Sequence, residues 1–442
     1  MNTHTQQNMP QENILKETLT TALKTKKYSG FLQNLARKLV LAKLQSLQNG
    51  KLEIIEAFSP EHTNSLAKSL AKPLVFGHGD LSAKITVLDA HFYGEIAFGG
   101  TIGAAEAYML GYWTTDNLTH VIRIMARSVA TTDTLEGSLA TLAKPLLKTL
   151  HWLNRNTEAG SRKNIAAHYD LGNPFFELML DHTMMYSCGI FESANTTLEQ
   201  ASVKKLDVIC KKLDLKSTDH VIEIGAGWGG FAIYAARNYG CKVTTTTISQ
   251  AQFDLALARV KAANLQDSIT ILLKDYRVLE GKFDKLVSIE MIEAVGYQFY
   301  DTYFAKCASL LKPNGLALIQ AITIVDQRFE QAKKSVDFIQ RYIFPGSCIP
   351  SNTAMQNSIT RASDLRLLDL QDIGPHYAPT LAGWRHNFFE KIEQVRALGY
   401  SEAFIKMWEF YLCYCEGGFE ERALGDVHLL LAKPDARRAV LP

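Results

Sequence analysis

The sequence predicts an α/β protein built on a doubly wound, mostly parallel sheet and preceded by a smaller α+β domain. From about residue 200 onward, short apolar strands alternate with helical segments, which is typical of consecutive βαβ units. A glycine-rich turn, Gly225–Gly230, joins one of these strands to the following helix. Before about residue 130, β-type segments punctuated by glycine lie between helical segments instead.

In the N-terminal region, apolar residues at helical spacing predict a helix over Ile14–Leu47 with a break at Ser29–Gly30. Residues 1–12 are polar and are expected to be disordered. Next along the chain we expect a small sheet and two helices, the strands at Leu74–Phe76, Ala83–Leu88 and Phe92–Phe98 and the helices at Thr101–Tyr112 and Leu118–Ala130. Thr131–Gly137 is rich in Thr, Asp and Glu and marks a boundary, so we place the domains at 1–130 and 161–442, with a linker at 131–160.

The C-terminal region is expected to form the larger sheet. Its predicted strands are His220–Ile224, Lys242–Thr247, Ile269–Leu273, Lys285–Ile289 and Leu316–Ala321. Its predicted helices are Lys204–Leu213, Phe231–Tyr239, Gln250–Ala263 and Phe299–Leu311. In such a sheet, ligands bind at the carboxyl ends of the strands.

Composition excludes several classes of protein. The 442 residues contain 47 Lys and Arg against 45 Asp and Glu. No apolar run approaches the roughly 20 residues that a membrane-spanning helix needs. The N-terminus lacks the basic and apolar regions of a secretory signal, so we expect a cytoplasmic protein. The 7 cysteines show no metal-binding spacing, which predicts reduced thiols and no metal site.

Basic residues gather in two segments despite the balanced total. Residues 1–50 carry seven Lys or Arg against two Glu, and residues 121–163 carry seven against three acids. Each basic residue near an anionic bilayer contributes about 1 kcal/mol, so these segments are candidates for a membrane surface. A solvated helix face is the alternative for either segment.

The glycine turn also satisfies the Gly-x-Gly-x-x-Gly pattern of dinucleotide-binding folds. That fold needs an acidic residue about 20 positions further on to bind a ribose, but the second strand ends at Thr247 and continues Ile248-Ser249. A nicotinamide cofactor therefore lacks its second anchor. An adenosine ligand of another kind lacks the usual ribose carboxylate as well, and a turn that binds nothing is a further alternative.

Acidic residues follow two more of the predicted strands. Asp275 and Tyr276 come directly after the third strand, where a carboxylate and a ring can meet an adenine. Glu290 and Glu293 follow the fourth strand and share one side if they lie on a helical turn. One of these two carboxylates then faces a site. The alternative is that both acids only stabilise the N-terminus of a helix, where negative charge is favourable.

Several short motifs in order resemble the cyclopropane-fatty-acyl-phospholipid synthases, S-adenosylmethionine-dependent enzymes that act on membrane lipids. The motifs are His168–Asn173, Met185–Gly189, Glu223–Gly230, Thr247–Gln252, Asp275–Arg277 and Tyr342–Gly346. The resemblance is continuous from about residue 160 and looser before it, chiefly through Gly103–Tyr108. It implies a Rossmann-like methyltransferase sheet with a helical acyl-binding cap near 325–415, after a small lipid-binding domain.

The resemblance also implies which positions hold ligands. S-adenosylmethionine is expected to contact Tyr186 and Ser187 at its methionine part, the backbone at Gly225 and Gly227, Ile248 and Gln252 on the ribose and adenine side, and Asp275 and Tyr276 at the adenine. A bicarbonate ion is expected to contact Cys188, Glu293, the backbone of Ile322, and Tyr377. Where better-known members carry His, this sequence has Gln320, and Ala294 replaces a second family His. No metal is implied, and we expect Cys188 to act through backbone and shape.

The chemistry explains why such a site is needed. An alkene is a poor nucleophile, so its alignment with the sulfonium supplies much of the rate. Methyl transfer leaves a carbocation, which aromatic faces stabilise. Candidates for this role are Tyr169, Phe175, Tyr342, Phe344, Tyr377 and Trp384. Bicarbonate is then expected to remove a proton so that the ring closes. Gln320 donates hydrogen bonds but, unlike His, carries no charge and exchanges no proton near neutral pH.

The predicted function is transfer of a methylene group from S-adenosylmethionine to the cis double bond of an unsaturated phospholipid acyl chain, forming a cyclopropane ring. Loss of a proton from a neighbouring chain carbon gives a methylene- or methyl-branched chain instead. A non-catalytic lipid-binding protein and a nicotinamide oxidoreductase are the remaining alternatives. We expect peripheral docking on the inner face of the membrane through the N-terminal domain and no nucleic acid partner; a homodimer stays open.

Overall fold

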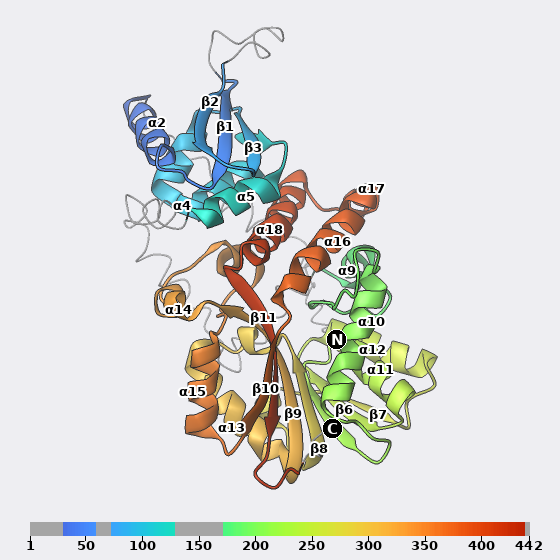
Figure 1. The fold of residues 1–442 in the computed structure, drawn as a ribbon. Helices are drawn as coiled ribbons and strands as arrows, with labels where there is room; N and C mark the ends of the chain where they lie inside the picture. The colour runs from blue at the N-terminus through green and yellow to red at the C-terminus, as the bar shows by residue number, and fades with distance from the viewer. Residues whose placement is uncertain (1–29, 59–71, 129–170, 438–442) are drawn as a thin grey trace, which may run out of the picture. The chain divides into compact units, whose positions relative to one another are not determined.

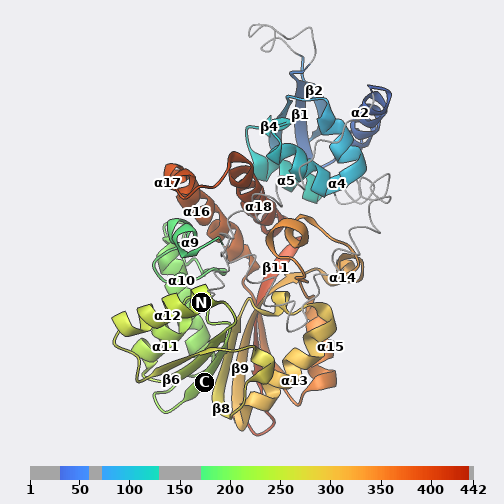
Figure 2. The same cartoon turned by 180° about the vertical axis from the view of Figure 1, so that it is seen from behind.

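The computed structural model describes residues 30–58, 72–128 and 171–437. The chain divides into two compact units (Figures 1 and 2). The smaller unit combines residues 1–143 with 393–411, and the larger combines 144–392 with 412–442. The predicted linker at 131–160 and the part of the predicted N-terminal helix before Gly30 lie outside the described residues. The proposed boundaries therefore stay predictions.

A four-stranded sheet with the order β2-β1-β3-β4 forms the centre of the smaller unit. Its strands are β1 (Gly50–Glu56), β2 (Leu74–His78), β3 (Ser82–Val87) and β4 (Trp113–Thr115). β1 runs antiparallel to β2 and parallel to β3, and β3 pairs antiparallel with β4. The N-terminal helices are α2 (Gly30–Leu44), α4 (His91–Met109) and α5 (Leu118–Arg127). Parts of α17 (Ile392–Ala397) and α18 (Glu402–Glu420) belong to the same unit.

The strand predicted at Phe92–Phe98 is wrong, because this segment is the first half of helix α4. Most of α4 is buried and its apolar residues are not confined to one face. A helix of this kind shows no amphipathic period, so its sequence resembles a buried strand. The helix kinks at Gly100, where φ is 57°. Beyond the kink, Gly103 lies so close to the first half that a Cβ there would be 1.9 Å from the carbonyl oxygen of Glu95.

A seven-stranded sheet with the order β10-β11-β9-β8-β5-β6-β7 forms the centre of the larger unit (Figure 1). Its strands are β5 (His220–Ile224), β6 (Lys242–Thr247), β7 (Ile269–Leu273), β8 (Phe283–Ile289), β9 (Leu311–Ile324), β10 (Arg366–Asp372) and β11 (Leu424–Ala432). The five strands from β5 to β9 are parallel, and β11 runs antiparallel to both its neighbours. The predicted doubly wound, mostly parallel sheet is confirmed, with β5, β6 and β7 at the predicted residues.

Helices cover both faces of this sheet (Figures 1 and 2). One face carries α10 (Leu198–Lys212), α11 (Gly230–Tyr239) and α12 (Gln250–Ala262), and the other carries α13 (Tyr300–Leu310) and α15 (Asn352–Ala362). Neighbouring β5 residues point to opposite apolar cores: Val221 packs with the first set and Ile222 with the second. This double burial explains the nearly continuous apolar runs of the central strands.

Between β9 and β11 the chain is mostly helical, as expected for an insertion near 325–415. It contains α14 (Asp326–Ala332), a π-helical turn at Ile339–Ile343, α15, α16 (Tyr377–Glu390), α17 and α18, together with strand β10. Its residues 393–411 group with the smaller unit. No helix among the described residues is both long and apolar enough to cross a membrane.

The close approach inside α4 makes a stability prediction. Gly103→Ala should lower the free energy of unfolding by on the order of 1–3 kcal/mol, because the new methyl group overlaps the carbonyl of Glu95. Gly99→Ala is the matched control in the same helix, since a Cβ there has no atom within 4 Å. Urea unfolding of both full-length variants measures the difference. Equal midpoints would show that the two halves of α4 do not meet at Gly103.

Candidate active site

The predicted site residues lie where the parallel strands end. Gly225 follows β5, Ile248 follows β6, Asp275 follows β7 and Glu290 follows β8, while Gln320 lies near the end of β9. The carboxyl ends of parallel strands share one edge of a sheet, where α/β proteins bind their ligands. The topology therefore gathers residues that are up to about a hundred positions apart in the sequence.

The glycine turn between β5 and α11 has the backbone that its sequence predicts. Gly225, Gly227 and Gly229 have φ values of 98°, 50° and 83°, which residues with a Cβ rarely adopt. A Cβ at Gly227 would meet no atom within 4 Å, so the turn borders open space. A Cβ at Gly230 would lie 2.6 Å from the carbonyl oxygen of Thr183. The turn thus leaves room for a ligand at Gly227 and contacts the loop around residue 183.

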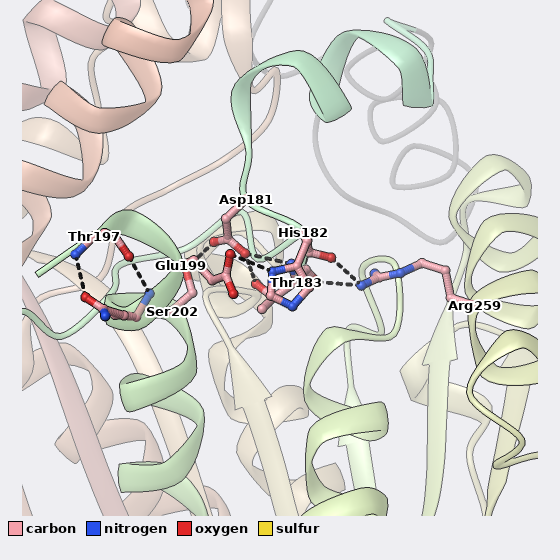
Figure 3. A network of polar contacts seen from close by, with 8 residues as sticks. Asp181, His182, Thr183, Thr197, Glu199, Ser202 and Arg259 are labelled. Carbon is pink, nitrogen blue, oxygen red and sulfur yellow. Dashed lines mark hydrogen bonds and ion pairs between the residues drawn. The ribbon is translucent and has the colours of Figure 1, made fainter.

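A polar network holds that loop in place (Figure 3). Arg259 of α12 donates to the carbonyl oxygen of Trp228 in the glycine turn at 2.6 Å, and to those of His182 and Thr183 at 2.9 and 3.0 Å. Asp181 accepts hydrogen bonds from the Thr183 side chain and from Ser202 of α10. The loop that leads into Tyr186 and Ser187 is therefore tied to both the glycine turn and the flanking helices.

Glu223 provides a buried carboxylate next to the turn. It lies in β5 two residues before Gly225 and is 2% exposed, and its Oε2 atom has no hydrogen-bond partner among the described residues. Burial raises the pKa of Glu223 to about 8. A buried carboxyl oxygen without a partner, in the strand that leads into a turn with open space at Gly227, fits a ligand that carries an amine or hydroxyl. The methionine amine and the ribose of S-adenosylmethionine both meet this requirement.

The other residues predicted to hold the cofactor have partners of their own. Ser187 accepts a hydrogen bond from Lys205 at 2.7 Å, and Gln252 accepts one from Thr247 at 2.8 Å. Asp275 is 2% exposed. Its carboxylate accepts from the Arg277 guanidinium at 2.9 and 2.6 Å.

The two predicted rings are held by other aromatic side chains. Tyr276 packs edge-on against Tyr303, and Tyr186 lies 5.0 Å from Trp384 between ring centroids. Asp275 also fixes the turn after β7, because it accepts hydrogen bonds from the backbone and the guanidinium of Arg277.

The residues predicted to bind bicarbonate converge on a carboxylate of the protein. The Glu290 Oε1 atom accepts from the backbone N–H of Cys188 and from Nε2 of Gln320, each at 2.8 Å. Its Oε2 atom accepts from the Tyr377 hydroxyl at 2.6 Å. Glu290 and Glu293 are not on one helical turn, because Glu290 has φ of 47° and only Ile292–Ala294 form a 3₁₀ turn.

Gln320 is fully buried and its amide is fully engaged. Its Nε2 atom donates to Glu290 at 2.8 Å and to Asp426 at 2.9 Å, and its Oε1 atom lies 3.2 Å from Nε2 of His428. An amide nitrogen has two hydrogens, so both are donated to carboxyl groups. In this arrangement Gln320 has no N–H left for an anion.

Glu293 belongs to the same cluster, because the charge of Glu290 acts on it. Its Oε1 atom accepts from the backbone N–H of Ile322 at 2.5 Å, while Oε2 is buried without a hydrogen-bond partner among the described residues. Burial and the negative charge of Glu290 raise the pKa of Glu293 to about 8. Glu293 therefore takes the backbone donor that was expected to hold bicarbonate.

The cluster is rich in acids, and among the described residues two lysines, Lys205 and Lys212, act on it. Burial raises the pKa of Asp426 well above its usual range, and repulsion by Glu290 raises it further. Glu290 accepts three hydrogen bonds, which favour its ionised form, whereas Asp426 accepts one from Gln320. We therefore place the shared proton on Asp426 and the charge on Glu290. Burial lowers the pKa of Lys205 to about 8.

Three members of the cluster were not among the predicted site residues, namely Lys205, Asp426 and His428, and Glu290 was considered without a definite role. Asp426 and His428 alternate within the apolar strand β11 and so share one face of the sheet. That spacing was a signal in the sequence. Lys205 lies in an amphipathic helix, where a lysine ordinarily faces solvent, so nothing in its pattern marked it as buried.

Aromatic side chains adjoin the carboxylate cluster. Tyr377 stacks on Phe419 with ring centroids 4.3 Å apart and meets Trp384 edge-on at 6.1 Å. Phe344 lies 6.5 Å from Tyr186, whereas Phe175 and Tyr342 contact other rings. Tyr169 lies outside the described residues. Of the predicted aromatic residues, Tyr377 therefore contacts Glu290 directly through its hydroxyl, and Trp384 packs against Tyr377.

Known proteins match both the sequence and this fold. A family model described as mycolic acid cyclopropane synthetase matches residues 156–429. Tuberculostearic acid methyltransferase UfaA1 of Mycobacterium tuberculosis is 39% identical over 329 residues, which cover 72% of this chain and 76% of the relative. Cyclopropane-fatty-acyl-phospholipid synthase of Escherichia coli K12 is 36% identical over 350 residues, covering 78% and 86%.

A solved structure agrees with these relatives. Mycolic acid cyclopropane synthase CmaA1, complexed with SAH and CTAB, is 29% identical and superposes with a TM-score of 0.56 over 62% of this chain and 98% of that one. Fold and relatives together define an S-adenosylmethionine-dependent methyltransferase. The chain belongs to the mycolic acid cyclopropane synthetase family, which confirms the resemblance seen in the sequence. Its relatives support action on lipids, and the nicotinamide alternative finds no support among them.

The buried Glu223 makes stability depend on pH. The native state keeps its proton up to about pH 8, whereas the unfolded chain releases it near the ordinary pKa of 4.5. The free energy of unfolding therefore falls as pH rises through this window. Between about pH 5 and about pH 8, the free energy of unfolding of Glu223→Gln should therefore fall less than that of the unaltered protein, by on the order of a few kcal/mol. Urea unfolding at a series of pH values measures this difference. The exposed Glu280→Gln is the control; if Glu223→Gln were as pH-dependent as this control, the carboxyl would not be protonated.

Proposed function

We propose that this protein transfers a one-carbon unit from S-adenosylmethionine to the cis double bond of an unsaturated phospholipid acyl chain and closes a cyclopropane ring. The observation that carries the proposal is the buried carboxylate cluster with aromatic neighbours, placed at the strand ends beside the glycine turn. The match to a cyclopropane-fatty-acyl-phospholipid synthase supports the substrate class.

The protein's own residues have distinct roles in this proposal. S-adenosylmethionine supplies an electrophilic methyl group when it is bound. Glu223, Ser187 and the open backbone at Gly227 bind its polar parts, and Ile248, Gln252 and the turn at Asp275 bind the nucleoside. The faces of Tyr377 and Trp384 stabilise positive charge that develops on the acyl chain. The helical insertion after β9 shields the chain from water.

The bicarbonate ion expected at Cys188, Glu293, Gln320, Ile322 and Tyr377 stays a prediction. Three of these positions donate to Glu290 and a fourth donates to Glu293. The donors that an ion requires are therefore already paired with carboxyl groups.

A branched product is the second candidate. It is favoured by the relative named tuberculostearic acid methyltransferase, which is 39% identical. The first half of the chemistry is the same for both products, and they differ in which proton the lipid loses. The outcome thus depends on which hydrogen of the substrate faces the base.

We propose further that helix α2 docks on the membrane surface. Phe31, Leu35 and Leu39 follow one another at four-residue spacing and are 77%, 40% and 41% exposed. Lys38, next to this apolar stripe, is also exposed. An apolar stripe beside a basic residue is typical of helices that lie in the interface of an anionic bilayer. Peripheral membrane association supplies access to phospholipid without a spanning helix.

Proton NMR of recovered lipids tests the reaction. Purified protein is incubated with S-adenosylmethionine and vesicles of a cis-monounsaturated phospholipid, and S-adenosylhomocysteine replaces the cofactor in the control. We expect upfield cyclopropyl protons. Exocyclic vinyl protons would establish the methylene-branched product instead. NMR is used because this product and the cyclopropane are isomers with the same mass. Unaltered lipid, with no cofactor consumed, would contradict the enzymatic proposal.

Vesicle sedimentation tests the docking helix. Leu35→Glu should weaken binding to anionic vesicles about tenfold or more, since it replaces inserted apolar surface by a charge that anionic lipid repels. Leu257→Glu is the matched control, because Leu257 is similarly exposed, at 43%, on helix α12 of the larger unit. If both variants sedimented with the vesicles as strongly as the unaltered protein does, α2 would not be the part of the protein that contacts the membrane.

A further inference from the structure

We propose that the carboxylate of Glu290 is the general base of the reaction and occupies the position that the family resemblance assigns to bicarbonate. This inference rests on the proposed function. It comes from one coincidence in the structure: three of the donors expected to hold an external anion meet oxygens of this side chain, and the fourth, the backbone N–H of Ile322, is taken by Glu293.

The contacts of Glu290 are those of a bound anion. Two donors meet at Oε1, the backbone N–H of Cys188 and the amide of Gln320, and the Tyr377 hydroxyl meets Oε2. All three distances lie between 2.6 and 2.8 Å, which is the range of hydrogen bonds to charged acceptors. A carboxylate has the planar pair of oxygens that a bicarbonate ion would offer to the same donors. The side chain therefore substitutes for the ion in both shape and charge.

Charge in the cluster opposes an additional anion. Glu290 carries the negative charge of this buried region, since burial raises the pKa of Glu293 and of Asp426 so that both hold protons. Among the described residues, Lys205 and Lys212 are the cations that act on the cluster. Lys205 donates its hydrogen bond to the hydroxyl of Ser187. Because like charges repel strongly in a low-dielectric interior, a further negative ion there is unfavourable.

Two properties of Glu290 suit it to accept a proton. It is half-buried, whereas Gln320, Asp426 and His428 show no exposed surface, so the cluster opens to its surroundings at Glu290. Its φ of 47° is uncommon for a residue with a side chain, and such backbone strain concentrates at functional sites. The next residue, Met291, lies 3.4 Å from the position of a Cβ on Gly225. The base thus adjoins the glycine turn.

The reaction balances with this base alone. The π electron pair of the lipid double bond forms a bond to the methyl carbon, the sulfur keeps the pair of the broken sulfur–carbon bond, and the neighbouring chain carbon becomes positive. A Glu290 oxygen then takes one proton from the new methyl group. The electron pair of that C–H bond closes the ring, and protonated Glu290 later releases the proton to solvent. Gln320 acts as a positioning residue, because it donates a hydrogen bond to the Glu290 carboxylate, and Asp426 holds Gln320 by accepting a second one.

The test compares bicarbonate dependence with the effect of Glu290→Gln. Full-length protein is assayed on cis-monounsaturated phospholipid vesicles in buffer purged of carbon dioxide, with and without added bicarbonate. We expect less than a twofold difference for the unaltered protein. Glu290→Gln should lower kcat about 100- to 10,000-fold, the usual range for loss of a general base, with unchanged S-adenosylmethionine affinity by calorimetry. The exposed Glu280→Gln should keep full activity.

Binding of the ion gives a readout that does not depend on turnover. Carbon-13 NMR of labelled bicarbonate should show no bound ion with the unaltered protein, and binding should appear in Glu290→Ala, where the donors are released. Bicarbonate binding or a large rate loss on its removal in the unaltered protein would overturn the inference, as would full activity of Glu290→Gln. If the unaltered protein consumes no cofactor under any condition, the proposed function itself fails. If the protein forms the ring only when bicarbonate is present, the proposed function holds, but Glu290 is not the base.

Discussion

The buried amide of Gln320 is the interaction on which the site depends. One nitrogen bridges two carboxyl groups, Glu290 at 2.8 Å and Asp426 at 2.9 Å, and the oxygen of the same amide meets His428. Unpaired, these buried groups would each cost several kcal/mol. Gln320 lies in β9, and its partners lie just after β8 and in β11. Its hydrogen bonds therefore also fix the register of these three strands at the edge where the ligands are expected.

The sheet and the site are thus built from the same residues. Gln320 pairs with Ile289 on one side and His428 on the other, so the side-chain network follows the backbone ladder. The neighbouring strand β5 leads into glycines with positive φ, and Arg259 ties that turn to the loop before Tyr186. The part of the site that would hold a nucleoside and the carboxylate cluster therefore belong to one rigid framework within the larger unit.

Much of this framework followed from the sequence. The strands β5, β6 and β7 were predicted to the residue, because each is a short run rich in β-branched residues. Phe92–Phe98 was assigned wrongly because a helix buried on all sides has no period. The roles of Lys205 and Asp426 could not be predicted, since they depend on which polar side chains meet across strands far apart in the sequence. The resemblance supplied the positions near Gln320, but only the structure shows that Glu290 accepts hydrogen bonds from three of them.

Gln320 stands where the resemblance implies a His, and an amide at this position changes the chemistry in a definite direction. A neutral amide cannot share a proton with its neighbours, so the cluster gains its acid–base capacity from carboxyl groups. A crystal structure with S-adenosylhomocysteine, grown in excess bicarbonate, tests this account most directly. It predicts the Glu290 carboxylate within hydrogen-bond distance of the Cys188 N–H, Gln320 and the Tyr377 hydroxyl, with no separate ion there. A planar three-lobed ion bound by these donors, with Glu290 turned away, would contradict it.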